Sequence, residues 1–353
     1  MLVAPDSFKG TIGAREVAAA IAAGLRAGGV PVDPCPVADG GEGTLAALMP
    51  ALGAHRQTAK AHDPLGREIV ATFALIGARG RAGPGVILEA AGASGLGLVA
   101  EHERDAMAAS TAGTGELILA AVRAGAEVVY VGVGGSASTD GGVGAIDAIR
   151  IGGGLRGARL VVLCDVRTSF EDAARVFGPQ KGAGPDDVRR LTRRLHGLAR
   201  RLDRDPRGVP MTGAAGGLAG GLWAAFGAEL VAGAAFVLDA IGFDRRMRAA
   251  RAVVTGEGRL DRQSLAGKAI SEVATRARQS GVPCHAIVGR NELDAFEARI
   301  LDLQAVLEAG TPEQLECAGR RLVELLQRDL PAPHGGQPAM PPSTANGLPG
   351  RSA

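Results

Sequence analysis

The stretch LVAPDSFKGTIGAREVAAAIAAGLRAGG, residues 2–29, predicts a strand, a polar loop and a helix in succession. Residues 2–5 are apolar, and Val17, Ile21 and Leu25 recur at the spacing of one helical face. A pair of glycines then ends the helical pattern. We therefore take strand, loop and helix as the unit from which the chain is built.

The same unit recurs along the chain. Further strands are expected at 86–89, 127–133, 160–163, 252–255, 283–288 and 305–307, and helices at 114–124, 270–279 and 312–328. Strands that alternate with helices indicate an α/β fold, in which helices cover both faces of a mostly parallel sheet. In such folds ligands bind beyond the carboxyl ends of the strands.

Composition narrows the class of protein. The chain has 353 residues, enough for two domains, and a net charge of +2 with acidic and basic residues interspersed. The Arg-rich stretch 189–204 has leucines at helical spacing and no interleaved aromatic residues, which predicts a solvated helix and no nucleic-acid surface. No apolar run predicts a membrane span, and the cysteines lack metal-ligand spacing, so we expect a cytoplasmic protein. Residues 331–353 are rich in Pro and Gly and are expected to form a disordered tail.

Glycine clusters that contain a carboxylate, a hydroxyl or a lysine follow several of the predicted strands. Phosphoryl transfer needs backbone N–H groups for phosphates, carboxylates for Mg²⁺ and for the attacking hydroxyl, and lysine for the transferred charge. Each cluster alone also has a plainer interpretation. Asp6 and Asp39 fit helix N-caps, Asp140 fits a turn, and Lys181 and Lys268 fit exposed positions. Their joint occurrence at strand ends favours a site for an anionic ligand with a metal.

Standard nucleotide-binding motifs are missing, since the chain has no G-x-x-x-x-G-K-[ST] sequence. The run Gly132-x-Gly134-x-x-Ala137 after a predicted strand does fit the relaxed dinucleotide pattern. Asp165 ends the next clear strand, where a ribose-binding acid would lie. An NAD-dependent dehydrogenase is therefore an alternative, although it leaves the other clusters unexplained.

The chain resembles the glycerate kinase type I family in a collinear series of segments across residues 2–325. They are APDSFKG (4–10), ADGGEGT (38–44), GTGELI (113–118), GGSASTDGG (134–142), CDV (164–166), FGPQKGA (177–183), GAAGGL (213–218) and TGEGRLD (255–261), followed by GK (267–268). The resemblance implies ATP-dependent phosphorylation of D-glycerate with Mg²⁺. The implied product is 2-phosphoglycerate, with 3-phosphoglycerate as the other option.

The resemblance also implies two α/β domains with the active site in the cleft between them. A discontinuous flavodoxin-like domain would comprise residues 1–65 and 250–330, and a central restriction-enzyme-like domain would comprise residues 66–249. Small molecules are then the expected partners, and a homodimer is one option for the assembly. A non-catalytic sensor of sugar acids on the same fold stays open, but the retained carboxylates and lysines argue against it.

The candidate site residues follow from these clusters and from the resemblance. The candidate catalytic residues are Asp39, Glu257, Asp261, Lys268 and Lys181. Those expected to hold substrate or phosphate are Asp6, Ser7, Lys9, Gly40, Gly41, Glu42, Gly134, Gly135, Ser136, Gly216 and Gly217. Asp140 and Asp165 are the candidate metal ligands. The sequence does not distinguish the carboxylate that acts as a base from those that bind metal.

Overall fold

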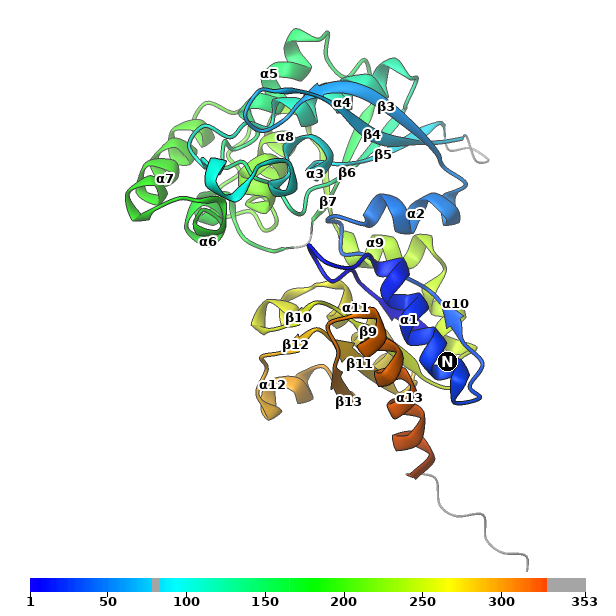
Figure 1. Cartoon of the computed structure of the whole chain (residues 1–353). Helices are drawn as coiled ribbons and strands as arrows, with labels where there is room; N and C mark the ends of the chain where they lie inside the picture. The colour runs from blue at the N-terminus through cyan, green and yellow to red at the C-terminus, as the bar shows by residue number, and fades with distance from the viewer. Residues whose placement is uncertain (78–82, 165, 329–353) are drawn as a thin grey trace, which may run out of the picture.

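The structure is a computed structural model that describes residues 1–77, 83–164 and 166–328. Asp165 and the expected tail at 331–353 lie outside the described residues. Within the described part the strands form two large sheets and a small two-stranded one. Figure 1 shows the two large sheets in separate halves of the molecule, joined where α2 and α9 lie. The chain is therefore of the mixed α/β class that the alternating pattern predicts.

The first sheet combines strands from both ends of the chain, in the order β13-β11-β9-β1-β2, and all of its pairings are parallel. Counted along the chain, these strands stand in the order 2-1-3-4-5 of a common doubly wound fold. The strands are β1 (Leu2–Pro5), β2 (Asp33–Pro34), β9 (Val253–Gly256), β11 (Cys284–Val288) and β13 (Leu303–Glu308).

Helices cover both faces of this sheet because its strands alternate their side chains between two apolar layers. Val3, Val254 and Ile287 pack in one layer with α1 (Ala14–Ala27) and α13 (Pro312–Arg328). Leu2 and Val253 point into the other layer, which includes side chains of three more helices. These are α9 (Gly233–Ala240), α10 (Phe243–Arg248) and α11 (Ala269–Gln279).

The second sheet has the order β3-β4-β5-β6-β7-β8, with an antiparallel edge at β3, β4 and β5 and parallel pairings beyond it. Its strands are β3 (His55–His62), β4 (Glu68–Ile76), β5 (Gly85–Glu89), β6 (Val128–Gly132), β7 (Arg159–Cys164) and β8 (Glu229–Ala232). One face packs on α4 (Ala112–Arg123), α5 (Val143–Ile151) and α8 (Leu218–Phe226). On the other face, Ile87 contacts Leu48 of α2 (Thr44–Leu52) and Val237 of α9.

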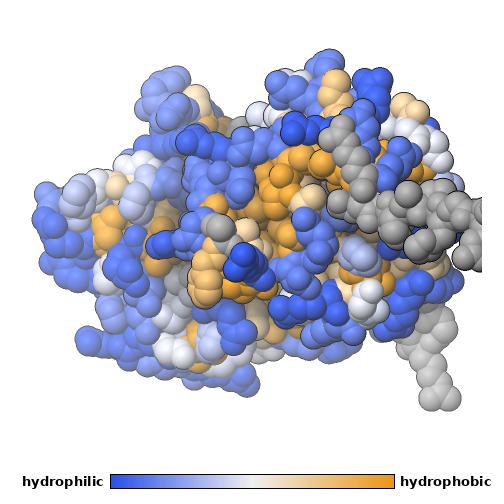
Figure 2. All heavy atoms as spheres, turned by 90° about the horizontal axis from the view of Figure 1, so that it is seen from below, coloured by the Kyte–Doolittle hydropathy of each residue, from blue (hydrophilic) through white to orange (hydrophobic). Residues whose placement is uncertain are grey.

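The remaining elements flank the two sheets. Leu191, Leu195 and Leu198 of α7 are buried, which confirms the prediction of a solvated helix with one apolar face. The other elements are α3 (Ala91–Ser94), α6 (Ala173–Phe177), α7 (Pro185–Ala199), α12 (Ala295–Ile300), and the small parallel sheet of β10 (Arg259–Leu260) and β12 (Arg290–Asn291). No helix in the described ranges is both long and apolar enough to cross a membrane. In the view from below, hydrophilic residues surround a central group of apolar ones (Figure 2).

The strand pairings place the boundaries between the two halves of the molecule elsewhere than at residues 65 and 249, the expected domain boundaries. β3 lies within the segment 1–65, yet it pairs along its length with β4 of the second sheet. Helices α9 and α10 precede residue 250, yet Leu238, Phe243 and Met247 pack in the core of the first sheet. Among the described residues, the first sheet therefore has no strand between Pro34 and Val253, and the chain returns to this half of the molecule after β8.

Candidate active site

The carboxyl ends of β1 and β9 bring Asp6 and Glu257 together. Pro5 and Gly256 are paired in the parallel register, and each carboxylate residue directly follows its strand. Asp6 donates its backbone N–H to the Gly256 carbonyl, and its own carboxylate accepts the N–H of Ser7 at 2.6 Å. Two residues that are 251 positions apart thus lie on one edge of the first sheet.

Asp39 joins this edge from the loop after β2. Its side chain is fully buried, with Oδ2 3.1 Å from the ammonium group of Lys9 and Oδ1 accepting the backbone N–H of Gly41 at 3.0 Å. Burial raises the pKa of Asp39, but the charge and hydrogen bond of Lys9 outweigh it and bring the pKa below its ordinary value. Burial and the negative charge of Asp39 raise the pKa of Asp6 well above its usual range. The two neighbouring aspartates therefore have pKa values shifted in opposite directions.

Glu257 is the third carboxylate of this group. Its Oε2 lies 3.5 Å from the ammonium group of Lys268, and its Oε1 is buried. Burial raises the pKa of Glu257 more than the charge of Lys268 and the hydrogen bonds of Ser264 and Lys268 lower it. Because burial disfavours its ionised form, this carboxylate suits contact with a ligand proton or a cation.

These side chains face a cavity of about 440 Å³ beyond the carboxyl edge of the first sheet. The charged residues that line it are Asp6, Lys9, Glu257, Arg259, Lys268 and Arg290. A second cavity of about 380 Å³ lies on the other side of the 7–11 loop, and its charged lining residues are Lys9, Arg15 and Glu42. Ser7, with a buried hydroxyl that makes no hydrogen bond, and Lys9 line both cavities.

A second polar group lies at the carboxyl end of β6, in the loop 134–142. Lys181 is only 2% exposed and donates from Nζ to the Ser136 hydroxyl at 3.0 Å and to the Ser138 carbonyl. The interpretation of Lys181 as an exposed surface lysine is therefore wrong. Gly216 packs against the same loop, where a Cβ atom would lie 2.1 Å from the Ser138 carbonyl oxygen. Gly217 similarly abuts Gly141, so this glycine pair allows two loops to pack closely.

The Asp39 loop connects the two groups. A Cβ atom on Gly40 would lie 3.0 Å from both the Leu163 carbonyl oxygen and the Gly233 Cα, and Gly40 itself has φ +98°. Gly134 donates its N–H to the Gly40 carbonyl at 3.5 Å, a long hydrogen bond. The loop thus touches the ends of β6 and β7 and the start of α9. Glycines at these positions permit backbone contact between the two halves of the molecule.

Comparison with known proteins identifies the family. The model of the "Glycerate kinase family" matches residues 1–153 and 146–329, nearly the whole described chain. The chain belongs to the glycerate kinase family.

Individual members support this family assignment. A glycerate kinase of Halalkalibacterium halodurans is 37% identical over 330 residues, which cover 82% of this chain and 85% of that protein. A glycerate 2-kinase of Escherichia coli K12 is 36% identical, with 82% and 84% covered. A crystal structure assigned as glycerate kinase 2 from Salmonella typhimurium LT2 has a TM-score of 0.73 and 33% identity, covering 93% of this chain and 98% of that one. The predicted resemblance is confirmed, and the chain is a phosphotransferase of this family.

The family assignment excludes the alternative of an NAD-dependent dehydrogenase. The structure explains one glycine of the dinucleotide-like pattern, Gly132, by packing. A Cβ atom on Gly132 would lie 2.7 Å from the Gly40 carbonyl oxygen. Gly132 is therefore needed where β6 meets the Asp39 loop, and this packing accounts for a glycine that also matches a dinucleotide pattern.

In this member of the glycerate kinase family, Asp140 and Asp261 lie in local hydrogen-bond networks. Asp140 accepts hydrogen bonds from the backbone and hydroxyl of Thr111 and from the N–H groups of Gly142 and Gly144. It thereby anchors the start of α5 to the start of α4. Asp261 accepts the N–H of Gln263 at 2.8 Å, and it is not among the residues that line the 440 Å³ cavity. The sequence did not reveal these local roles, since an aspartate suits a turn or a helix cap as well as a ligand.

Three charged residues near the site were not among the predicted candidates. Arg259 and Arg290 line the larger cavity. Glu89, at the end of β5, is buried and accepts the N–H of Leu45 at 2.7 Å, and burial raises its pKa. Two of these residues could have been found from the sequence, because a charged residue at a strand end is a site candidate. Glu89 is the last residue of a predicted strand, and Arg290 lies two residues after β11.

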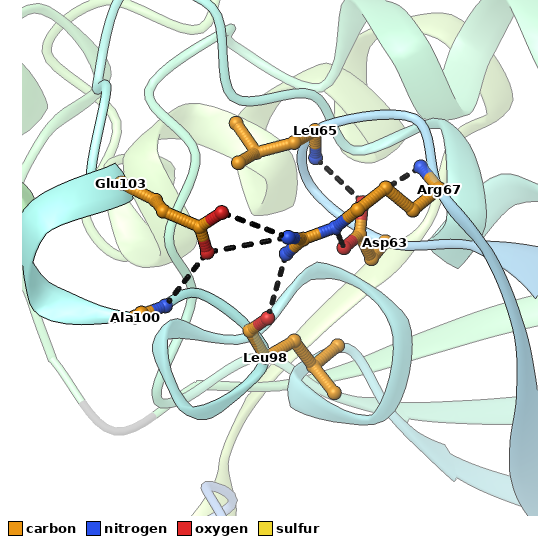
Figure 3. A network of polar contacts seen from close by, with 6 residues as sticks. All are labelled: Asp63, Leu65, Arg67, Leu98, Ala100 and Glu103. Carbon is orange, nitrogen blue, oxygen red and sulfur yellow. Dashed lines mark hydrogen bonds and ion pairs between the residues drawn. The ribbon is translucent and has the colours of Figure 1, made fainter.

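The loop that carries Ser136 is supported by a network centred on Arg67 (Figure 3). The guanidinium group of Arg67 donates to the buried Asp63 carboxylate, to Glu103 at 3.1 Å and to the Leu98 carbonyl at 3.1 Å. This ties the β3–β4 turn to the segment 96–103. Leu96 in turn donates its N–H to Gly135 at 2.9 Å, next to the bridge between Gly95 and Ser136. Through these contacts, the β3–β4 turn supports the polar loop 134–142.

Metal-binding capacity rests on few ligands. Within residues 1–77, 83–164 and 166–328, no three His, Cys, Asp or Glu side chains converge as a metal cage. Mg²⁺ in kinases is commonly held by one or two carboxylates together with substrate phosphates and water. Asp6 and Glu257 are carboxylates that line the larger cavity, and they suit that mode of binding.

Proposed function

We propose that this protein transfers the γ-phosphoryl group of ATP to D-glycerate and forms 2-phosphoglycerate. The observation that carries the proposal is the larger cavity, whose lining brings the Glu257 carboxylate together with the ammonium groups of Lys268 and Lys9. Family membership supports the substrate, and the name of the Escherichia coli relative, glycerate 2-kinase, supports the product.

Glu257 is our candidate for the base. Its carboxylate lines the larger cavity, and its raised pKa brings it closer to the range that suits proton transfer near neutral pH. In the proposed step the hydroxyl oxygen attacks the γ-phosphorus, the bond from phosphorus to the β,γ-bridging oxygen breaks, and ADP leaves. Lys9 and Lys268 stabilise the charge that spreads over the transferred group. Asp39 orients Lys9 and does not itself line the cavity.

Mg²⁺ would be held by Asp6, with the nucleotide supplying further oxygens. Asp6 is a buried carboxyl whose ionised form is disfavoured by burial and by Asp39, so a nearby divalent cation would stabilise it. When bound, Mg²⁺ supplies positive charge to the phosphates. Asp140 is not part of this proposal because both of its oxygens accept hydrogen bonds from the protein, while Asp165 stays a prediction.

We further propose that the half with the first sheet is a flavodoxin-like domain, that the other half is restriction-enzyme-like, and that substrates react between them. The 2-1-3-4-5 strand order and the contacts of Gly40 with both halves support this arrangement. We also propose a cytoplasmic location, because Cys35, Cys164, Cys284 and Cys317 form no disulfide.

A coupled assay with D-glycerate, ATP and Mg²⁺ tests the activity, and phosphorus NMR of the product reads the position. Splitting of the phosphorus signal by one C2 proton supports 2-phosphoglycerate, whereas splitting by two C3 protons gives 3-phosphoglycerate. Glu257→Gln is the matched inactive variant. Binding of D-glycerate by a folded wild-type protein without any turnover would instead support the sensor interpretation.

A further inference from the structure

Two arginines lie side by side in the lining of the larger cavity. Arg259 on β10 and Arg290 on β12 are register partners in the small parallel sheet. Both line the 440 Å³ cavity together with Lys268. Segments separated by 31 residues thus present two guanidinium groups to one cavity.

The hydrogen-bonding capacity of these guanidinium groups is unused. Each forms only an ion pair through Nε with the same Glu292 oxygen, at 3.9 Å for Arg259 and 3.2 Å for Arg290. Neither donates a hydrogen bond to any residue that the structure describes. By contrast, Arg246 and Arg276 donate to carboxylates at 2.6–2.9 Å. Since a guanidinium carries five N–H donors in a planar fork, both arginines can take a multidentate anion.

The lining of the cavity suits a polyanion better than a small monoanion. Its charged side chains comprise four cations, Lys9, Arg259, Lys268 and Arg290, against the two carboxylates Asp6 and Glu257. Glycerate carries one negative charge, whereas the triphosphate of a nucleotide carries several. Arginine pairs with phosphate in a bidentate manner, which gives orientation as well as affinity.

We infer that Arg259 and Arg290 bind the polyphosphate of the nucleotide, and that the nucleotide enters the site over the β10–β12 sheet. This inference rests on the proposed kinase function and adds a specific role for two residues. Glu292, which forms ion pairs with both arginines, then competes with the polyphosphate for their guanidinium groups.

Equilibrium binding of MgATP without glycerate, measured by titration calorimetry, tests the assignment independently of turnover. Arg259→Ala and Arg290→Ala are each expected to weaken ATP binding about tenfold, and the double variant about a hundredfold, because charge-assisted hydrogen bonds are lost. The KM for D-glycerate should stay within about twofold of the wild type. Melting temperatures and the lysine variants Arg259→Lys and Arg290→Lys, which keep the charge, separate lost binding from lost folding.

Three further variants sharpen the test. Arg262→Ala removes an exposed arginine that pairs with Glu297 and does not line the cavity, so ATP binding should not change. Arg15→Ala probes the smaller cavity and should also leave ATP binding unchanged. Glu292→Gln should tighten ATP binding several-fold, a gain that structural damage would not produce.

The outcomes separate the inference from the proposed function. If Arg15→Ala weakens ATP binding and the Arg259 and Arg290 variants do not, the polyphosphate lies in the smaller cavity and the inference is wrong, while kinase turnover stands. If the wild type binds ATP through Arg259 and Arg290 but does not phosphorylate D-glycerate, the inference holds and the proposed substrate is wrong.

Discussion

The ammonium group of Lys9 lies 3.1 Å from Oδ2 of Asp39, a pairing that joins the loop after β1 to the loop after β2. Asp39 is completely buried, whereas the Lys9 side chain is 50% exposed and lines both cavities. A buried carboxylate therefore holds a cation at the surface of the site. Because the same carboxylate accepts the Gly41 N–H, the pair also orders the loop that contacts the second sheet.

Asp39→Asn should lower kcat by about two orders of magnitude, because the amide no longer balances or orients the charge of Lys9. The fold should persist, since Lys9 is half-exposed and stays solvated. Steady-state kinetics with a thermal melt checks both statements. Asp205→Asn, which removes an exposed carboxylate paired with Arg207, is the control and should leave kcat unchanged. Normal turnover by Asp39→Asn would show that Asp39 has no part in the reaction.

The fall of kcat at acidic pH, the acidic limb of the pH–rate profile, should reflect the protonation of the Glu257 carboxylate. If this carboxylate accepts the hydroxyl proton, kcat falls as pH drops below its raised pKa. Lys268 lowers that pKa by its positive charge, so Lys268→Ala should move the limb to higher pH. The measurement is kcat at saturating substrates across the pH range 4–8, chosen around the pKa of ordinary and raised carboxyls. A limb that stays in place in Lys268→Ala would assign it to another group.

Asp6 and Glu257 were predicted as site candidates because each comes shortly after a predicted strand, at the end where parallel sheets place their ligands. Asp39 was a candidate through its glycine cluster, without a predicted strand before it. The sequence did not predict that Pro5 pairs with Gly256, and this pairing makes Asp6 and Glu257 neighbours. Lys268 was a candidate because it follows the glycine cluster of Glu257 in the sequence, and its 3.5 Å approach to Glu257 is seen in the structure. Local patterns thus identify strand ends, but the choice of strands that lie side by side depends on long-range pairing.

Other features had no usable sequence signal. β3 has the sequence HRQTAKAH and is mostly exposed, so it lacks the apolar alternation that predicts a strand. It lies at the edge of the second sheet, where it pairs with β4. Arg290 belongs to a two-residue strand, too short for any periodicity. Several glycines that suggested phosphate loops, such as Gly40 and Gly216, lie where two loops pack closely. Sequence alone does not reveal whether a glycine approaches a ligand or another backbone.

Gly233→Ala should loosen the junction between the two halves of the molecule. A Cβ atom at Gly233 would lie 2.3 Å from the Asp39 carbonyl oxygen, so the Asp39 loop or α9 must shift. We expect a loss of about 1–3 kcal/mol in the free energy of unfolding and a lower kcat, because the shift displaces Lys9. Urea unfolding and kinetics measure the two effects. The control is Gly197→Ala in α7, which has open space and should gain about 0.5–1 kcal/mol. Equal stability of the two variants would contradict the packing role of Gly233.

His285 should make the fold sensitive to mild acid. Its side chain on β11 is 3% exposed, neither ring nitrogen has a hydrogen-bond partner among the described residues, and burial lowers its pKa below the ordinary value of 6.5. The unfolded chain therefore binds the proton at higher pH than the folded one, so stability is full above about pH 6.5 and falls as pH drops toward the folded pKa. His285→Leu removes this linkage, and its melting temperature should fall less between pH 7 and pH 5 than that of the wild type. His55→Gln, at an exposed position, should follow the wild type. Parallel losses in His285→Leu and the wild type would mean that other groups govern the acid response, and that the sheet accommodates a charged His285.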